Sequence, residues 1–289
     1  MTGLSQKGGQ AHSSHRPGLW VSCADIMNKV MRPSPRHKPV SLFVTCITDM
    51  LYPQTGIAVV EILEHLDVEV RFPKAQTCCG QPAFNGGFWD EARAVARQFL
   101  TAFADAEVIV APSGSCTAMV RDHYPQLFQN DPEWYDRAVW ASSVTWEFTE
   151  YLVDGLGVTD IGAALPPTTI TFHDSCHGLR HMRVKEQARQ LAAQIEGVTI
   201  HEMDGADTCC GFGGLFAIKM ADLSVAMLAQ KCEHIAASDA DLVVCGDCSC
   251  MTHINGGLSR RQSDKRVIHI ADLLARGLHH AHSENNTQH

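Results

Sequence analysis

The sequence predicts an α/β protein with two pseudo-repeated units, each a small, mostly parallel sheet flanked by helices. Three observations predict this fold. A Cys-Cys-Gly stretch occurs twice, at residues 78–80 and 209–211. The landmarks around it recur in the same order at separations of 123 to 134 residues, which is typical of an internal duplication. Short β-branched runs alternate with amphipathic segments, which favours parallel strands joined by right-handed crossovers.

The composition limits the classes of function. The chain has 289 residues, 45% hydrophobic and 19% charged, which is typical of a globular protein. Its formal net charge of −9 argues against nucleic-acid or anionic-membrane partners, because both need clustered Lys and Arg. No stretch of the sequence is apolar over enough consecutive residues to span a membrane. The first thirty residues lack the basic and then apolar segments of an export signal. We therefore expect a cytoplasmic protein whose twelve cysteines are ligands or catalytic groups rather than disulfides.

The ends of the chain differ in composition from its middle. Residues 1–39 are rich in Gly, Ser, His, Pro and basic residues without a period, so we expect a flexible leader. Met31 is an alternative start. A linker at Pro166 and Pro167 separates the two units. The remaining segments that we expect are a first cysteine-rich unit, a second cysteine-rich unit and a flexible tail: residues 40–160, 166–280 and 281–289.

The hydrophobic pattern of each unit predicts the order strand, helix, strand, cysteine turn, helix and strand. In the first unit the expected strands are residues 40–44, 68–72 and 107–111, and the expected helices are residues 55–66, a segment from about 88, broken helix over 117–140, and a final block at 146–152. In the second unit the expected strands are residues 168–172, 198–201 and 241–244, and the expected helices are residues 183–194, a long helix from about Leu215 through Leu228, and a final block at 269–274.

The repeat identifies four cysteines in each unit as candidate ligands: Cys46, Cys78, Cys79 and Cys116, then Cys176, Cys209, Cys210 and Cys250. Four thiolates suit zinc or an iron–sulfur cluster. The first and last of each set follow strands, and ligands gather beyond the carboxyl ends of parallel strands. A helix beginning near Leu215 would direct its N–H groups towards the second cysteine pair. The alternative is a set of buried small residues copied by duplication, which does not require cysteine at glycine-rich turns.

Other cysteines and histidines have weaker patterns. Cys245 and Cys248 form a C-x-x-C without a counterpart in the first unit, so we treat them as optional extra ligands. Cys232 lies on an apolar helical stripe and is expected in the core. Three histidines spaced by four, at positions 173, 177 and 181, form either a polar face at a strand end or a hydrogen-bonding group beside a cluster.

Several cofactor motifs are absent. The glycine-rich stretch after Cys210 is not G-x-G-x-x-G, because Phe216 occupies the last glycine position. No phosphate-binding G-x-x-x-x-G-K-[ST] occurs, and no compact ferredoxin run of cysteines. If the chain transfers electrons, we therefore expect its donor or acceptor to be another polypeptide.

These motifs resemble the cysteine-rich CCG-domain family, which has two copies per chain. That family includes the catalytic B subunit of heterodisulfide reductase, the iron–sulfur subunit of glycolate oxidase and the lactate-utilisation protein A group. The resemblance extends from about residue 40 to residue 278, and the segments at 112–116, 208–214 and 249–251 look most like the lactate-utilisation group.

The resemblance implies a cytoplasmic iron–sulfur component of an L-lactate-oxidising complex with two other proteins. It implies [4Fe–4S] clusters held by the eight cysteines, with zinc as the alternative at one site. Heterodisulfide reductase subunits end each motif in C-x-x-C and use five cysteines per cluster. Here Met119 and His253 stand at that last position, so we carry over four-cysteine sites. The catalytic residues are not identified. The alternatives are a heterodisulfide or thiol–disulfide reductase and a zinc-stabilised structural subunit.

Overall fold

The computed structural model describes residues 32–287, and this part of the chain belongs to a single unit. Most of the expected leader, residues 1–31, lies outside the described residues, as do the last two residues of the expected tail.

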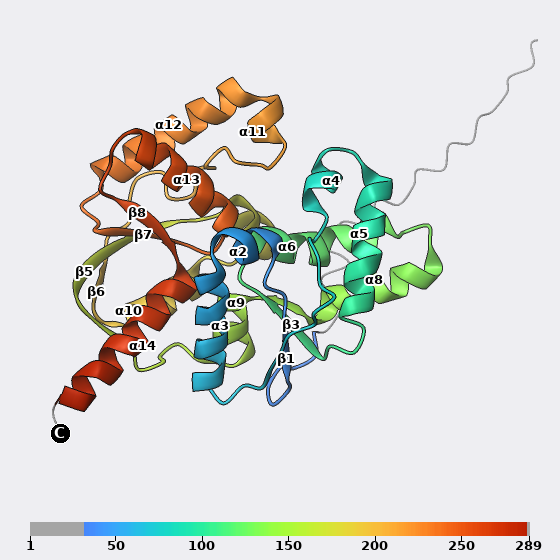
Figure 1. Ribbon diagram of the computed structural model, residues 1–289, viewed down its shortest axis with the longest axis horizontal. Helices are drawn as coiled ribbons and strands as arrows, with labels where there is room; N and C mark the ends of the chain where they lie inside the picture. Colours follow the sequence, from blue (N-terminus) through green and yellow to red (C-terminus); the bar gives the residue numbers. More distant parts are fainter. Residues whose placement is uncertain (1–31, 288–289) are drawn as a thin grey trace, which may run out of the picture. The chain divides into compact units, whose positions relative to one another are not determined.

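Two four-stranded parallel sheets form the framework of the fold (Figure 1). The strand order is β2-β1-β3-β4 in the first sheet and β6-β5-β7-β8 in the second. Neighbouring strands are parallel in both. The strands are β1 Val40–Leu42, β2 Val70–Arg71, β3 Val108–Ala111, β4 Thr145–Glu147, β5 Ala164–His173, β6 Glu196–Ile200, β7 Leu242–Cys245 and β8 Arg266–His269. The repeated order confirms the predicted α/β fold of two duplicated units.

Helices flank both sheets. In the first unit they are α2 Cys46–Leu51, α3 Pro53–His65, α4 Gln81–Asn85, α5 Trp89–Ala102, α6 Gly114–Ala118, α7 Tyr124–Leu127, α8 Pro132–Val144 and α9 Phe148–Glu150, with π-helices η1 Met119–His123 and η2 Tyr151–Gly155. In the second unit they are η3 Gly178–Met182, α10 Glu186–Ala193, α11 Phe216–Lys219, α12 Ala221–Ala237, α13 Cys248–Arg260 and α14 Ile270–Thr287.

Three apolar clusters hold these layers together. One cluster contains residues of both units and is therefore a shared core; α3 and α14 lie side by side in it (Figure 1). The second cluster lies between the first sheet and helices α5 and α8. The third lies between the second sheet and helices α12 and α13. Each sheet is thus covered on both faces, as parallel sheets generally are.

Helix α5 has the apolar face that the sequence predicts. Ala92, Ala96, Phe99 and Leu100 are buried on it, and Phe99 packs edge-on against Phe43 with ring centroids 4.9 Å apart. The prediction for Phe88 is wrong. Its side chain is 52% exposed, because it caps the helix instead of lying within its apolar face.

Two edge strands were not predicted. The expected helical blocks at 146–152 and 269–274 begin with the ends of β4 and β8, and only then become helical. Both strands are short, with three or four residues each, so neither has room for a recognisable period of two. Their pairing with β3 and β7 depends on contacts remote in the sequence.

Three boundaries differ from the prediction. Strand β5 begins at Ala164, so Pro166 and Pro167 lie inside it, where its register with β6 shifts. The expected long helix from Leu215 is two helices, α11 and α12, separated at Met220. The final helix α14 continues to Thr287, so most of the expected tail is helical.

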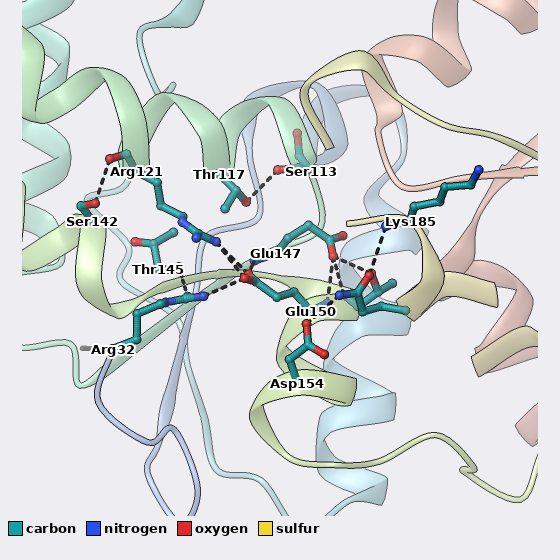
Figure 2. Close-up of polar contacts among 12 residues, drawn as sticks. Arg32, Ser113, Thr117, Arg121, Ser142, Thr145, Glu147, Glu150, Asp154 and Lys185 are labelled. Carbon is teal, nitrogen blue, oxygen red and sulfur yellow. Dashed lines mark hydrogen bonds and ion pairs between the residues drawn. The ribbon is translucent and has the colours of Figure 1, made fainter. Parts of the chain in front are cut away.

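The end of the expected leader packs against the first unit. The Arg32 guanidinium donates to Glu150 Oε1 at 2.7 Å and to the Thr145 carbonyl at 2.5 Å. It also lies 3.4 Å from the centre of the Trp146 ring. Arg121 contacts the same carboxylate at 2.9 Å (Figure 2). Two cations thus share one buried carboxylate, and this fixes the chain from Arg32 onward.

In the part of the chain between residues 32 and 287, every helix is too short or too polar to cross a lipid bilayer.

Candidate metal centre

The four predicted cysteines of the first unit come together at the carboxyl edge of its sheet. Cys46 begins α2 after β1, and Cys116 lies in α6 after β3. The Cys46 thiol donates to Cys78 Sγ at 3.6 Å, and the Cys79 thiol donates to Cys116 Sγ at 3.4 Å. The residue before Cys46, Thr45, has φ +69°, a backbone conformation that costs energy for a β-branched residue.

The second unit repeats this arrangement. Cys176 follows β5, and Cys250 lies in the first turn of α13 after β7. Cys209 accepts hydrogen bonds from Cys176 and Cys210, and the Cys210 thiol also interacts as a donor with Cys250. All eleven cysteines of the described residues are free thiols. The structure therefore brings together the two predicted sets of four sulfurs.

One sulfur in each set is strongly acidic. Hydrogen bonds from Cys46 and Cys79 lower the pKa of Cys78 to about 2. The corresponding bonds from Cys176 and Cys210 lower the pKa of Cys209 to about 2. Hydrogen bonding to Cys78 and then burial raise the pKa of Cys46. Each set thus contains a thiolate at neutral pH, the form of cysteine that binds metals.

Glycine follows each cysteine pair and supplies a backbone donor to it. The N–H of Gly80 donates to Cys78 Sγ, and the N–H of Gly211 donates to Cys209 Sγ, both at 3.4 Å. Both glycines have positive φ, +83° and +88°, which side chains disfavour. In the second unit a helix does begin near Leu215, as predicted, with α11 at Phe216. Its first N–H groups, however, donate to carbonyls of residues 212–214, so the turn and not the helix supplies the donor to Cys209.

Asp247 links the cysteine turns of the two units. Its Oδ1 accepts from the N–H of Ser249 and so caps α13. Its Oδ2 accepts from Ser113 Oγ at 3.1 Å and from the Ser115 N–H at 2.9 Å. Ser113 is itself the N-cap of α6, where its Oγ accepts from the Cys116 N–H. A buried carboxylate thus holds the loops of Cys116 and Cys250 against each other.

Both sets of cysteines face the same cavity. Its volume is about 110 Å³, and its lining includes all eight predicted ligands and Cys248. Groups bound by the two sets would therefore lie close to each other, although the sets belong to different units.

The two optional cysteines have different surroundings. Cys245 pairs with His173 in the strand register, and its thiol donates to the Asp247 carbonyl at 3.5 Å. Burial raises its pKa well above the ordinary value. Cys248 lines the shared cavity, and burial raises its pKa to about 12. Cys232 lies in the apolar core of the second unit, as predicted.

The three spaced histidines do not share a face. His177 and His181 stack with ring centroids 5.2 Å apart, and His177 Nδ1 lies 3.5 Å from Cys176 Sγ. His173 instead ends β5 and is fully buried. One of its ring nitrogens lies within 4.8 Å of the sulfurs of Cys210 and Cys250, and burial lowers its pKa to about 3.

Lys231 and Asp247 were not identified from the sequence. The side chain of Lys231 is buried, and its ammonium group donates to the carbonyl oxygens of Gly205 and Ala206 just before the second cysteine pair. It adds a positive charge near Cys210 and Cys250. An Asp immediately before a helix is a recognised N-cap, but α13 was itself not expected at 248–260, so the sequence offered a signal for Asp247 only together with a helix that was missed. It offered none for Lys231.

The donor sets fit a metal. Zinc–thiolate bonds of about 2.3 Å place the sulfurs of a tetrahedral site roughly 3.8 Å apart, and two sulfur pairs of the first unit lie 3.4 and 3.6 Å apart. Among the described residues, however, no three sulfurs of this unit lie within 4.8 Å of one another, so the two pairs would have to move together to share one zinc. Four cysteines also suit an iron–sulfur cluster, and the cavity of about 110 Å³ that the sulfurs line offers space beside them. The first unit thus presents four sulfurs, and the second presents four sulfurs and an imidazole.

Comparisons with known proteins agree with the duplication. The model of the cysteine-rich domain family CCG matches residues 40–121 and 170–255. Lactate utilization protein A 2 from Bacillus cereus is 44% identical over 239 residues, which cover 83% of this chain and 98% of that protein. Lactate utilization protein A from an Exiguobacterium species is 45% identical over 244 residues, which cover 84% of this chain and 99% of that protein.

One solved structure is similar in fold. A hypothetical protein from Helicobacter pylori matches with a TM-score of 0.50 at 11% identity. The match covers 88% of this chain and 53% of that chain. At this level of identity the similarity concerns the fold alone.

Proposed function

Because the chain belongs to the cysteine-rich CCG-domain family, we propose that it is the iron–sulfur electron-transfer component of a complex that oxidises L-lactate or a related 2-hydroxy acid. One observation carries the proposal: two four-cysteine sets from different units face one cavity. The substrate class rests on the relatives, which are named for lactate utilization.

In this proposal the eight cysteines bind two clusters of the [4Fe–4S] type. A bound iron–sulfur cluster takes up and releases single electrons. The acidic thiols of Cys78 and Cys209 provide the first thiolates for assembly. The N–H groups of Gly80 and Gly211 donate to sulfur, and hydrogen bonds of this kind tune the potential of such sites. Asp247 holds the two sets at a constant separation.

A structural zinc protein is a second candidate. Two sulfur pairs of the first unit, 3.4 and 3.6 Å apart, have nearly the spacing of two ligands of one tetrahedral zinc, which is roughly 3.8 Å; to share that ion, the two pairs would have to move together. Zinc at the first set would stabilise the fold without electron transfer, and would leave the second set as the redox site.

Partner proteins are part of the proposal. Lactate oxidation removes two electrons together, usually through a flavin or nicotinamide, and the sequence has no fingerprint for either. Exposed apolar side chains follow three of the cysteine turns: Met50, Leu51, Phe88, Trp89, Ile218 and Met220. The loop at Gly86 lies against Leu215, so the exposed side chains after the first cysteine pair adjoin those after the second. We propose that a partner subunit covers them and brings its own redox group near the cavity.

We also propose that the protein works in the cytoplasm. Eleven free thiols in the described residues suit a reducing compartment.

Anaerobic purification followed by iron, sulfide and zinc analysis tests the metal. We expect equal amounts of iron and acid-labile sulfide, and brown protein. Protein without iron that carries stoichiometric zinc would support the structural alternative. Cys232→Ala is the matched control, because Cys232 is buried but does not line the cavity that the two sets face.

A second assay tests the subunit role. Metal-replete protein is mixed with L-lactate and an artificial electron acceptor. We expect no turnover by the isolated chain and turnover after its partner subunits are added. Robust oxidation of lactate by the chain alone would refute the subunit role and indicate a self-sufficient enzyme.

A further inference from the structure

His173 is a buried polar side chain without an evident structural partner. It is 2% exposed, and among the described residues neither Nδ1 nor Nε2 makes a hydrogen bond of ordinary geometry; the ring has only a weak contact with the backbone of Ala206. Burying an imidazole without partners costs free energy. The fold therefore keeps an unsatisfied donor and acceptor at the end of β5, beside the second cysteine set.

The ring is positioned to bind a metal. Its coordinating nitrogen and the sulfurs of Cys210 and Cys250 all lie within 4.8 Å of one another. Donors that share one tetrahedral ion at bond lengths of about 2.0–2.3 Å lie roughly 3.5–3.8 Å apart. Shifts of up to about 1 Å would thus let all three bind one metal atom. In the part of the chain that the structure describes, the first unit has no equivalent group of donors.

Comparison of the two units argues against a structural need for histidine here. In the second sheet, His173 continues β5 beside Cys245 of β7. At the equivalent place in the first sheet stands Phe43, whose N–H donates to the Val110 carbonyl just beyond β1. Phe43 packs against Phe99 and Phe103 in an apolar core. The same fold thus accepts an apolar ring at this position, so the imidazole needs another explanation.

We propose that an imidazole nitrogen of His173 is a ligand of the metal centre in the second unit, beside Cys210 and Cys250. The two centres then differ in kind, with four thiolates in the first and four thiolates plus an imidazole in the second. This rests on the metal-binding part of the proposed function and not on its substrate.

The additional ligand has an electronic consequence. Imidazole is a neutral donor, and a centre with imidazole in place of thiolate has a higher potential. We expect His173 to hold the potential of the second centre above the value that a cysteine ligand at the same position would give.

Nitrogen hyperfine spectroscopy of the reduced, full-length protein tests the ligand. With ¹⁵N-histidine labelling, we expect one strongly coupled nitrogen to change from the ¹⁴N to the ¹⁵N pattern. In His173→Phe, which copies the first unit, this signal should disappear. We also expect a chelator to remove metal from the second set at least about tenfold faster. If the bound metal is zinc, cobalt(II) substitution makes the same centre paramagnetic, and the ligand remains testable even if the electron-transfer role fails.

Two variants locate the source of the signal. His177→Gln removes a second imidazole near the set, whose Nδ1 lies 3.5 Å from Cys176 Sγ, and should retain the strong coupling. His269→Asn removes a second fully buried imidazole with an unpartnered nitrogen, and keeps an acceptor for the Ala271 N–H that His269 Nδ1 now binds. It should also retain the coupling.

His173→Cys covers the case in which His173→Phe does not fold. It should keep the metal, lose the nitrogen coupling and lower the midpoint potential, because it adds a thiolate charge. A wild-type centre without strongly coupled nitrogen, or a signal that survives in His173→Cys, would overturn the proposal.

Discussion

The glycines after the two cysteine pairs form a matched pair for mutation. Gly80 has φ +83° and Gly211 has φ +88°. Alanine at either position would hold a Cβ in the left-handed region, at a cost of about 1–2 kcal/mol. This backbone cost is common to Gly80→Ala and Gly211→Ala, so a difference in stability between the two variants must come from the atoms around each turn.

The surroundings differ in the structure. A Cβ at Gly211 would lie 2.8 Å from the Ser224 carbonyl oxygen and 3.0 Å from Met227 Cβ. A Cβ at Gly80 would meet nothing nearer than Val95 Cγ1, at 3.4 Å. Ser224 Oγ also donates to the Gly211 carbonyl at 2.7 Å, so α12 is tied to this turn and cannot move away freely.

We therefore expect Gly80→Ala to lower the free energy of unfolding by about 1–2 kcal/mol. Overpacking against backbone adds about 1–3 kcal/mol at the second turn. The sum for Gly211→Ala is about 2–5 kcal/mol. The Gly211 N–H that donates to Cys209 Sγ would also move, so this variant should release metal faster from the second set.

Anaerobic urea unfolding at matched metal content measures the two costs. Gly256→Ala is a control within α13, because a Cβ there meets nothing within 4 Å; it should be neutral or stabilising by up to about 1 kcal/mol. Equal costs for Gly80→Ala and Gly211→Ala, or a larger cost for Gly80→Ala, would refute the steric reasoning.

Three other predictions test different parts of the molecule. Cys209→Ser should remove the metal of the second set only, whereas Cys232→Ala should retain the metal of both sets. The metal content per chain measures this, and full metal content in Cys209→Ser would contradict the assignment. Burial raises the pKa of Glu147 from 4.5 to about 7, so its contribution to stability is present below pH 4.5 and is lost as the pH rises through 7. Relative to Glu147→Gln, the wild-type protein should lose up to about 3 kcal/mol of unfolding free energy between pH 4.5 and 7. If the unfolding free energies of the two proteins changed in parallel with pH, the prediction would be wrong. Arg32→Ala should lower the free energy of unfolding by about 1–2 kcal/mol, because it removes an ion pair and a ring contact. The control is Arg137→Ala, which removes an exposed ion pair and should cost under about 0.5 kcal/mol. Equal melting temperatures for the two variants would count against an anchoring role of Arg32.

The repeated motifs were sufficient to predict the fold class and the two groups of cysteines. Cys46 and Cys176 each follow a buried strand, and the carboxyl ends of parallel strands meet at one edge of a sheet. The apolar face of α5 could also be predicted, because a helix of fourteen residues is long enough for its apolar residues to recur clearly at helical spacing. Strands β4 and β8 were missed, because a strand of three or four residues shows no period of its own.

The sequence by itself determined which cysteines belong to each unit, because each set repeats within one copy of a local motif. Only the tertiary structure decided that both sets face a single cavity, and that Asp247 of one unit caps the cysteine loop of the other. It also separated His173 from His177, although their spacing suggested one helical face: the strand β5 ends between them and directs His173 into the core. Such contacts join residues far apart in the chain, and they depend on how two sheets pack, which no local pattern encodes.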